Sequence, residues 1–178
     1  MPIDDLDPID RRIIATLQAD GRLSNVELAE RIGLSPSPCL RRVRRLEQEG
    51  YIAAYRATLQ RNRIGLGLTV FIGVRIESHA DERCDAFQDT IVAMPEVVAF
   101  HLVSGDTDYL VEVVVPDLAH YQRFLLDKLL SLPIIKEVRS NIAIQTLKEA
   151  APLPLAHLEP PRPAARAKSV PRRRPGSR

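Results

Sequence analysis

The sequence predicts an α+β protein in which an N-terminal winged helix-turn-helix precedes a ferredoxin-like βαββαβ domain. Three observations lead to this prediction. Residues 1–63 show helical periodicity, residues 64–150 show strand and helix patterns in alternation, and residues 151–178 end in a basic stretch rich in proline. We therefore expect a helical N-terminal domain, a second domain of strands and helices, and a disordered tail, in that order.

The first two predicted helices have clear start and stop signals. Asp7-Pro8 offers a capping carboxylate and a proline suited to a first turn, and this helix ends near Asp20-Gly21. A second begins at Ser24 or Asn25 and stops at Gly33, because glycine readily takes the positive φ of a tight turn. The residues expected to face inward are Ile9, Ile13, Ile14, Leu17, Val26, Leu28, Ala29 and Ile32.

The third predicted helix, from Ser35 to Glu49, is amphipathic in an unusual way. Its apolar face comprises Cys39, Leu40, Val43 and Leu46. The residues expected to bind DNA are Ser35, Ser37, Pro38, Arg41, Arg42, Arg44, Arg45 and Gln48. Four arginines within five positions repel one another unless an anion compensates, and the major groove of duplex DNA admits an α-helix. A solvated basic helix is the plain alternative, but the preceding helix and glycine turn favour DNA recognition.

The segment after this helix predicts a wing. Tyr51–Leu59 alternates and contains aromatic and apolar residues, as in a short strand or hairpin. We expect Arg56, Arg61 and Arg63 to extend the positive charge beyond it.

Residues 64–150 change from helical periodicity to alternation between strands and helices. The strands are expected around Val70–Ile76 and at Val97–Val103, Tyr109–Val115 and Val138–Leu147, and the helices at Asp81–Met94 and Leu118–Leu130. The helix residues expected to face inward are Cys84, Phe87, Ile91, Val92, Leu118, Tyr121, Leu125 and Leu129. Because Val111–Val115 is nearly continuous valine, we expect the other sheet face to be apolar too, and therefore to pair with a second copy.

Composition and charge limit the class of protein. Of 178 residues, 45% are apolar and 27% charged, as in soluble globular proteins. No apolar run reaches the roughly 18–20 residues that cross a membrane, the acidic start is no secretory signal, and Cys39 and Cys84 stand alone. We expect a cytoplasmic protein with no membrane association, metal or other cofactor.

The distribution of charge indicates where DNA would bind. Residues 1–63 carry 11 basic and 9 acidic side chains, residues 64–159 carry 7 and 14, and residues 160–178 carry 7 and none. The middle block is therefore a poor candidate for contacting phosphates. The tail either adds phosphate contacts that are independent of sequence or only solubilises the chain.

Two stretches resemble one known family. NVELAERIGLSPSPCLRRVRRLEQEGYI at 25–52 closely resembles the helix-turn-helix of the Lrp/AsnC, or feast/famine, transcriptional regulators. HLVSGDTDYLVEVVVPDLAHYQRFL at 101–125 resembles the effector and assembly domain of the same family, also called a RAM-type domain. The similarity runs from about Leu6 to Lys148, and SPSPCLRRVRRLE with HLVSGD is most similar to the leucine-responsive branch.

The resemblance implies a homodimer that assembles into octamers, and an amino-acid effector bound between subunits. Carried over, the effector site would be lined by Gly105, Asp106, Thr107 and Asp108. Relatives often have an aromatic residue where Thr107 stands, which puts the shape of that site in doubt. Taken alone, Gly105-Asp106 is also an ordinary hairpin turn.

Two other functions compete with this reading. Asp106, Asp108 and the nearby His101 could suggest an enzyme, but no nucleophile, phosphate loop or metal-ligand set accompanies them, so we expect no catalytic residues. A ligand-independent architectural protein that compacts DNA is the second alternative. It is favoured by Thr107, which stands where relatives often have an aromatic residue, and by the basic tail.

Overall fold

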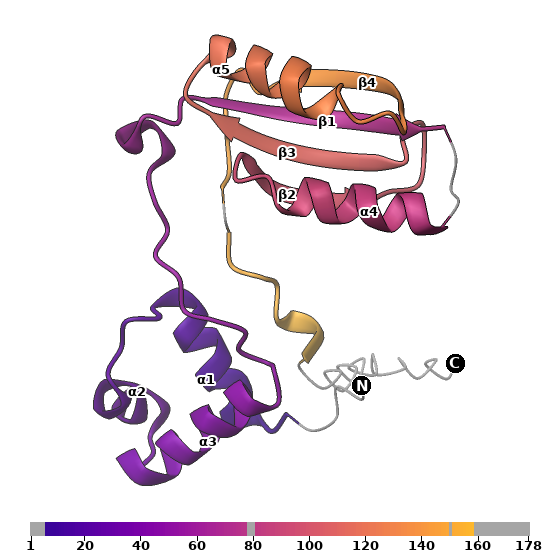
Figure 1. Ribbon diagram of the computed structural model, residues 1–178. Helices are drawn as coiled ribbons and strands as arrows, with labels where there is room; N and C mark the ends of the chain where they lie inside the picture. The colour runs from indigo at the N-terminus through magenta and orange to yellow at the C-terminus, as the bar shows by residue number, and fades with distance from the viewer. Residues whose placement is uncertain (1–5, 78–80, 150, 159–178) are drawn as a thin grey trace, which may run out of the picture. The chain divides into compact units, whose positions relative to one another are not determined.

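The computed structural model describes residues 6–77, 81–149 and 151–158, which form two compact units (Figure 1). The first unit is Met1–Ala57 together with Ala151–Arg178, and the second is Thr58–Ala150. The division near residue 58 lies a few residues before the predicted boundary at 63. Residues 151–158, expected to belong to a disordered tail, instead pack in the first unit, and the rest of that tail lies outside the described residues.

Three helices form the first unit: α1 (Pro8–Ala19), α2 (Asn25–Ile32) and α3 (Pro36–Gln48). The predicted caps are present, since Asp7 and Ser24 each accept a backbone amide hydrogen bond within a capping box. Gly33 ends α2 at a φ of 77°. The core consists of Leu6, Ile13, Leu17, Leu28, Ala29, Ile32, Cys39 and Leu46. Val26, predicted to face inward, is 62% exposed because the short α2 buries only one side.

The C-terminal segment returns to this three-helix unit. Gln18 of α1 donates a hydrogen bond from Nε2 to the carbonyl oxygen of Leu153, at 2.9 Å. A single 3₁₀ turn, η4 (Ala156–Leu158), follows, and Leu158 packs against the apolar core. The chain therefore passes between the two units twice, once before and once after the second unit in the sequence.

The second unit is a four-stranded antiparallel sheet with the predicted order of elements. It contains β1 (Leu68–Ile76), α4 (Asp81–Val92), β2 (Val97–Leu102), β3 (Tyr109–Val115), α5 (Leu118–Arg123) and β4 (Ile135–Ile142). The strands lie in the order β2-β3-β1-β4 (Figure 1). This is the ferredoxin-like arrangement that the sequence predicts.

One face of the sheet is buried beneath both helices. Alternate residues of β1 and β3 pack against Phe87 and Ile91 of α4 and Tyr121 of α5. The aromatic rings of Phe87, Phe100 and Tyr109 contact one another in this core. Burial on one side of each strand thus accounts for the predicted alternation.

The end of the second helix differs from the prediction. After α5 the chain continues as a π-helical segment, η3 (Phe124–Leu129), so residues five apart rather than four share a face. Phe124 and Leu129 are buried, whereas Leu118 is 61% exposed and not inward as predicted. Val92 at the end of α4 is likewise exposed, and β4 begins at Ile135, three residues before the predicted start.

The open face of the sheet is less apolar than predicted. Because the other valines point to the helices, its side chains along β3 are Leu110, Glu112 and Val114, of which Val114 is buried. Phe71 on β1 lies between Glu112 and Asn141 in the register. Charged and apolar side chains therefore alternate on this face.

Candidate DNA-binding helix and effector turn

The helix that the sequence assigns to DNA recognition is held at its N-terminal end and along its inner face. Ser35 stands at the N-cap and Pro36 begins the first turn, but the Ser35 side chain makes no capping hydrogen bond. Asn25 at the start of α2 donates from Nδ2 to the carbonyl oxygen of Pro36, at 2.8 Å. On the inner face Cys39 and Leu46 are fully buried. Burial also raises the pKa of the Cys39 thiol, which favours the neutral packed form.

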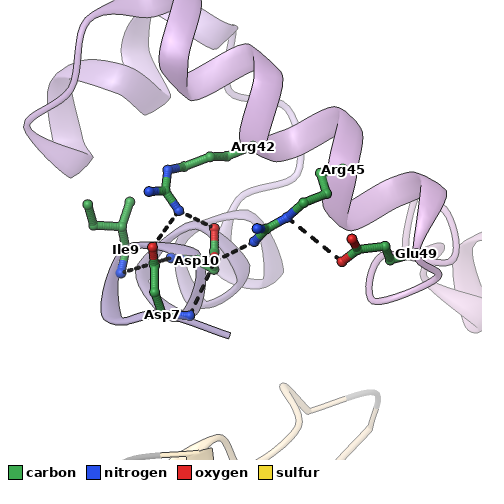
Figure 2. Close-up of polar contacts among 6 residues, drawn as sticks. All are labelled: Asp7, Ile9, Asp10, Arg42, Arg45 and Glu49. Atoms are coloured by element: carbon green, nitrogen blue, oxygen red, sulfur yellow. Dashed lines mark hydrogen bonds and ion pairs between the residues drawn. The ribbon is translucent and has the colours of Figure 1, made fainter. Parts of the chain in front are cut away.

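The four arginines of α3 divide into two pairs. Figure 2 shows Arg42 and Arg45 reaching back to the start of α1. Arg42 Nη1 lies 2.6 Å from Asp7 Oδ2 and 2.9 Å from Asp10 Oδ1. Arg45 Nη2 lies 2.5 Å from Asp10 Oδ2, and its Nε lies 3.8 Å from Glu49 Oε2. These two arginines, both predicted to bind DNA, are thus engaged by carboxylates of their own domain.

Asp10 is the buried centre of this cluster. Its side chain is 1% exposed, and besides the two guanidinium groups it accepts the backbone amide of Asp7 at 3.2 Å. Asp7 in turn accepts the amide of Asp10. Partial burial acts to raise the pKa of Asp7, but the Asp10 amide and the Arg42 guanidinium hold it below its usual value of 3.8. The sequence analysis did not single out Asp10, although its spacing with Ile13 and Leu17 places it on the inward stripe.

The outer side of α3 keeps the other pair of arginines. Arg41 and Arg44 are exposed, and neither is ion-paired within the part of the chain that the structure describes. An open hollow on this side is lined by Ser37, Leu40, Arg41, Arg44, Arg45 and Gln48. Ser35 is also exposed, and Pro38 is half-buried. Two unpaired cations with adjacent hydroxyl and amide groups can bind phosphates and base edges.

The segment predicted to form a wing takes a different form. Tyr51–Leu59 runs without pairing to any described strand, so the expected short strand or hairpin is wrong. Tyr55 nevertheless anchors it, donating from its hydroxyl to Glu47 Oε1 of α3 at 3.0 Å. Burial and this hydrogen bond to a carboxylate raise the pKa of Tyr55 to about 12.

Arg61, expected to extend the positive charge beyond the wing, has another role. It lies in η2 (Arg61–Ile64) of the second unit, with Nη1 2.9 Å from Glu112 Oε1 and Nε 2.6 Å from Glu149 Oε1. Its charge is therefore compensated within that unit. The prediction failed because the two glutamates come from distant parts of the sequence.

The predicted effector turn lies between β2 and β3, and two of its four residues, Thr107 and Asp108, contact β1. The backbone amide of Asp108 donates to the carbonyl oxygen of Val74 at 3.0 Å, and Asp108 Oδ2 accepts the amide of Ile76 at 2.9 Å. These bonds hold the point where the β1–β4 register shifts, between Arg75 and Ile76. Asp108 therefore has a structural role in the hairpin.

Thr107 packs under the same turn. A Cβ on Gly73 of β1 would lie 2.7 Å from the Thr107 methyl carbon, so this close approach requires a glycine. By contrast Gly105, at a φ of 133°, and Asp106 are exposed. Only Gly105 and Asp106 among the four predicted effector residues are fully available to a ligand.

The second unit also contains a hollow beside α4. It is lined by Glu77, Arg83, Ala86, Phe87, Thr90, Leu132, Pro133 and Ile134, and its walls are mostly apolar. Sequence periodicity gave no signal for it, because its lining comes from both α4 and the segment before β4. Among the described residues no group of three or more His, Cys, Asp or Glu could hold a metal ion. No helix in the described ranges is long and apolar enough to span a membrane.

A helix-turn-helix with an exposed basic third helix, joined to a ferredoxin-like domain, defines a two-domain class of transcriptional regulator. The family model described as winged helix-turn-helix DNA-binding matches residues 6–53, and that described as the Lrp/AsnC ligand binding domain matches residues 69–153. The chain is 42% identical over 149 residues to the leucine-responsive regulatory protein of Escherichia coli K12, which covers 84% of this chain and 91% of the relative. The chain belongs to the Lrp/AsnC family of transcriptional regulators, a family that is not enzymatic.

Solved structures agree with this assignment. A transcriptional regulator from Neisseria meningitidis, in complex with L-Met, is 40% identical with a TM-score of 0.82, covering 86% of this chain and 99% of that one. An AsnC family regulator from Agrobacterium tumefaciens is 38% identical with a TM-score of 0.81, covering 85% and 99%. The resemblance inferred from the two sequence stretches is thereby confirmed.

Proposed function

We propose that this regulator binds duplex DNA sequence-specifically by placing α3 in the major groove. The observation that carries the proposal is the exposed, unpaired state of Arg41 and Arg44 on α3. An arginine can donate two hydrogen bonds to the O6 and N7 atoms of guanine, and its charge also suits phosphate. Gln48 supplies an amide farther along the same side, where it can reach adenine or a phosphate.

The N-terminal end of α3 is suited to the DNA backbone. The hydroxyls of Ser35 and Ser37 are exposed, and Ser35 is not occupied by capping. Free backbone amides at a helix N-terminus attract anions, so a phosphate beside these serines is favourable. Pro38 packs at the edge of this surface and shapes it without donating a hydrogen bond.

Selection from a pool of random duplexes tests this function. The wild-type protein should enrich a defined sequence and bind it at least 1,000-fold more tightly than random duplex, on the order of specific regulators at physiological salt. Equal binding to selected and random duplexes would contradict sequence-specific recognition.

We propose further that an amino acid binds at the turn containing Gly105 and Asp106. Support comes from the Neisseria relative, whose structure is a complex with L-Met, and from the match to a ligand-binding family model. Gly105 allows a ligand to approach the backbone, and the Asp106 carboxylate can meet an α-ammonium group. Because Thr107 and Asp108 are engaged by β1, we propose that another chain supplies the remaining contacts.

The proposed assembly is a dimer that forms octamers. The family resemblance suggests it, and the open sheet face supports it by presenting Phe71 and Leu110 beside Glu112. Such a mixed surface suits an interface with specific register rather than a continuous apolar one. Sedimentation at several concentrations should give a dimer and a larger closed species, whereas a monomer throughout would contradict the proposal.

A titration with the twenty amino acids tests the effector site. At least one amino acid should change the affinity for the selected duplex, and Asp106→Asn should abolish that change. Asp89→Asn removes an exposed acid of α4 in the same unit and should leave the response intact. A response that survives Asp106→Asn would contradict the turn as the site and would favour the hollow beside Phe87.

A ligand-independent architectural protein is the second candidate. The packing of Thr107 against Gly73 favours it, since this close contact leaves little room for a ligand on that side of the turn. The seven basic residues at 160–178 also favour it. Under this alternative none of the twenty amino acids alters DNA binding, and compaction of long DNA proceeds without any of them.

A further inference from the structure

The pairing of arginines on α3 has a consequence for how the protein distinguishes DNA sequences. Asp7 and Asp10 carry two negative charges, and Arg42 and Arg45 carry two positive charges, so the cluster is neutral as a whole. Half of the arginine charge on α3 is therefore cancelled within the domain. Contacts to phosphates raise affinity for every DNA sequence alike, so cancelling charge limits binding that is independent of sequence.

We propose that Asp10 is a specificity-determining residue that holds Arg42 and Arg45 away from the DNA backbone. The proposal rests on the DNA-binding function proposed above. Asp10 acts as a positioning residue, because its 1% exposed side chain contacts arginines and not DNA. With two arginines held back, Arg41 and Arg44 are the cations of α3 that remain for DNA.

The geometry makes release of either arginine unfavourable. Arg42 and Arg45 bond different oxygens of Asp10, at 2.9 Å and 2.5 Å. If Arg45 moved to a phosphate, a buried carboxylate oxygen would lose its charged donor, and leaving a buried charge without its partner is costly. An exposed contact to a phosphate, screened by salt, offers less in return.

Arg45 borders the outer hollow but is not free, because Asp10 holds its guanidinium group. It is 41% exposed at the side chain, and Arg42 is 28% exposed. Without Asp10, Arg45 would keep only the longer contact to Glu49, whereas Arg42 would still be paired with Asp7. Asp10 thus prevents the charges of Arg42 and Arg45 from contributing to DNA binding.

Asp10→Asn tests the proposal, because an amide offers one acceptor oxygen in place of two charged ones. The readout is the slope of log affinity against log salt concentration on a random-sequence duplex. The slope should steepen by about 0.9 for each released arginine in each bound subunit. Binding to random duplex should tighten and the preference for the selected duplex should fall.

Glu30→Gln is the matched control. It also removes one negative charge from the domain, but Glu30 is an exposed acid of α2 that is bonded to none of the four arginines. Its salt slope should equal that of the wild type. A folded Asp10→Asn protein, judged by its melting curve, with the slope of the wild type would overturn the proposal, since a merely structural role changes melting and not the slope.

If Asp10→Asn does not fold, three single variants decide instead. On random duplex, Arg42→Gln and Arg45→Gln should leave the salt slope unchanged. Arg44→Gln should flatten it by about 0.9 in each bound subunit, because without a matching base this exposed arginine contacts phosphate. Equal flattening by Arg45→Gln and Arg44→Gln would overturn the proposal. Failure of the underlying function looks different, because the wild-type protein itself would then bind neither duplex or show no preference.

Discussion

The third helix and the effector turn are both predicted sites that the fold engages in part: two of the four arginines on the helix and two of the four residues in the turn. On α3 the engaged residues are Arg42 and Arg45, and in the turn they are Thr107 and Asp108. The two regions differ in what remains exposed. The helix still presents two unpaired cations and several polar groups, whereas the turn presents one glycine and one carboxylate.

This difference indicates how much of each site one chain contains. The outer side of α3 has enough donors for major-groove contacts without help from a second chain. The turn has too few groups to enclose an amino acid, so a complete effector site requires groups from elsewhere. Engaged residues should therefore control stability, and exposed residues should control binding.

The largest expected effect in the turn comes from Asp108. Asp108→Ala leaves the Ile76 amide without its acceptor at the register shift, so unfolding of the second unit should cost about 1–3 kcal/mol less. Thermal melting measures this change. Asp108→Asn keeps an acceptor oxygen and should be close to the wild type. Equal destabilisation by both variants would mean that the carboxylate charge, rather than this bond, matters.

A substitution at Gly73 tests the contact between Thr107 and β1, with a smaller expected effect on stability. Gly73→Ala places a methyl group 2.7 Å from the Thr107 methyl carbon, and because threonine can rotate the expected loss is about 1 kcal/mol. Adding Thr107→Ser removes the clashing methyl and should restore most of the melting temperature. No recovery in the double variant would show that the two residues do not compete for space.

The ion pair between Asp7 and Arg42 predicts that the stability of the protein falls slightly at acidic pH. Because the folded pKa of Asp7 is below 3.8, its contribution to stability is present above that pH and is lost as pH falls through the folded value. Asp7 is 43% exposed, so the contribution should stay below about 1 kcal/mol. Chemical denaturation from pH 6 to pH 3 should show this loss in the wild type and not in Asp7→Asn. A parallel loss in both would assign it to another acid.

The tail should have the smallest effect on recognition. Removing residues 160–178 takes away seven basic side chains and no acidic ones. We expect a flatter salt dependence with the same preferred sequence, because phosphate contacts do not read bases. Competition between the selected and random duplexes measures the preference. A changed preference would mean that the tail contacts bases.

Much of the fold could be predicted from local signals. The caps at Asp7 and Ser24, the turn at Gly33 and the alternation in β1 and β3 are all decided by residues close in sequence. The π-helical segment after α5 could not be predicted in this way, since it shifts the buried face by one residue at Phe124. The unpaired form of Tyr51–Leu59 also escaped prediction, because an extended segment needs a partner to become a strand.

The candidate DNA-binding site could be predicted only as far as residues close in sequence determine it. Helical spacing places Arg41, Arg44 and Gln48 correctly on the outer side of α3. It could not divide the arginines into two pairs, because the partners of Arg42 lie 32 and 35 residues away along the chain. Long-range ion pairs are set by tertiary packing, and periodicity carries no information about them.

One measurement tests whether the arginines of α3 are divided into a pair that binds DNA and a pair held by the fold. Affinity for the selected duplex relative to random duplex is compared for Arg44→Gln and Arg45→Gln at one salt concentration. We predict that Arg44→Gln loses about 1–3 kcal/mol of discrimination, as for one bidentate base contact, while Arg45→Gln keeps the discrimination of the wild type. A loss from Arg45→Gln as large as that from Arg44→Gln would contradict it.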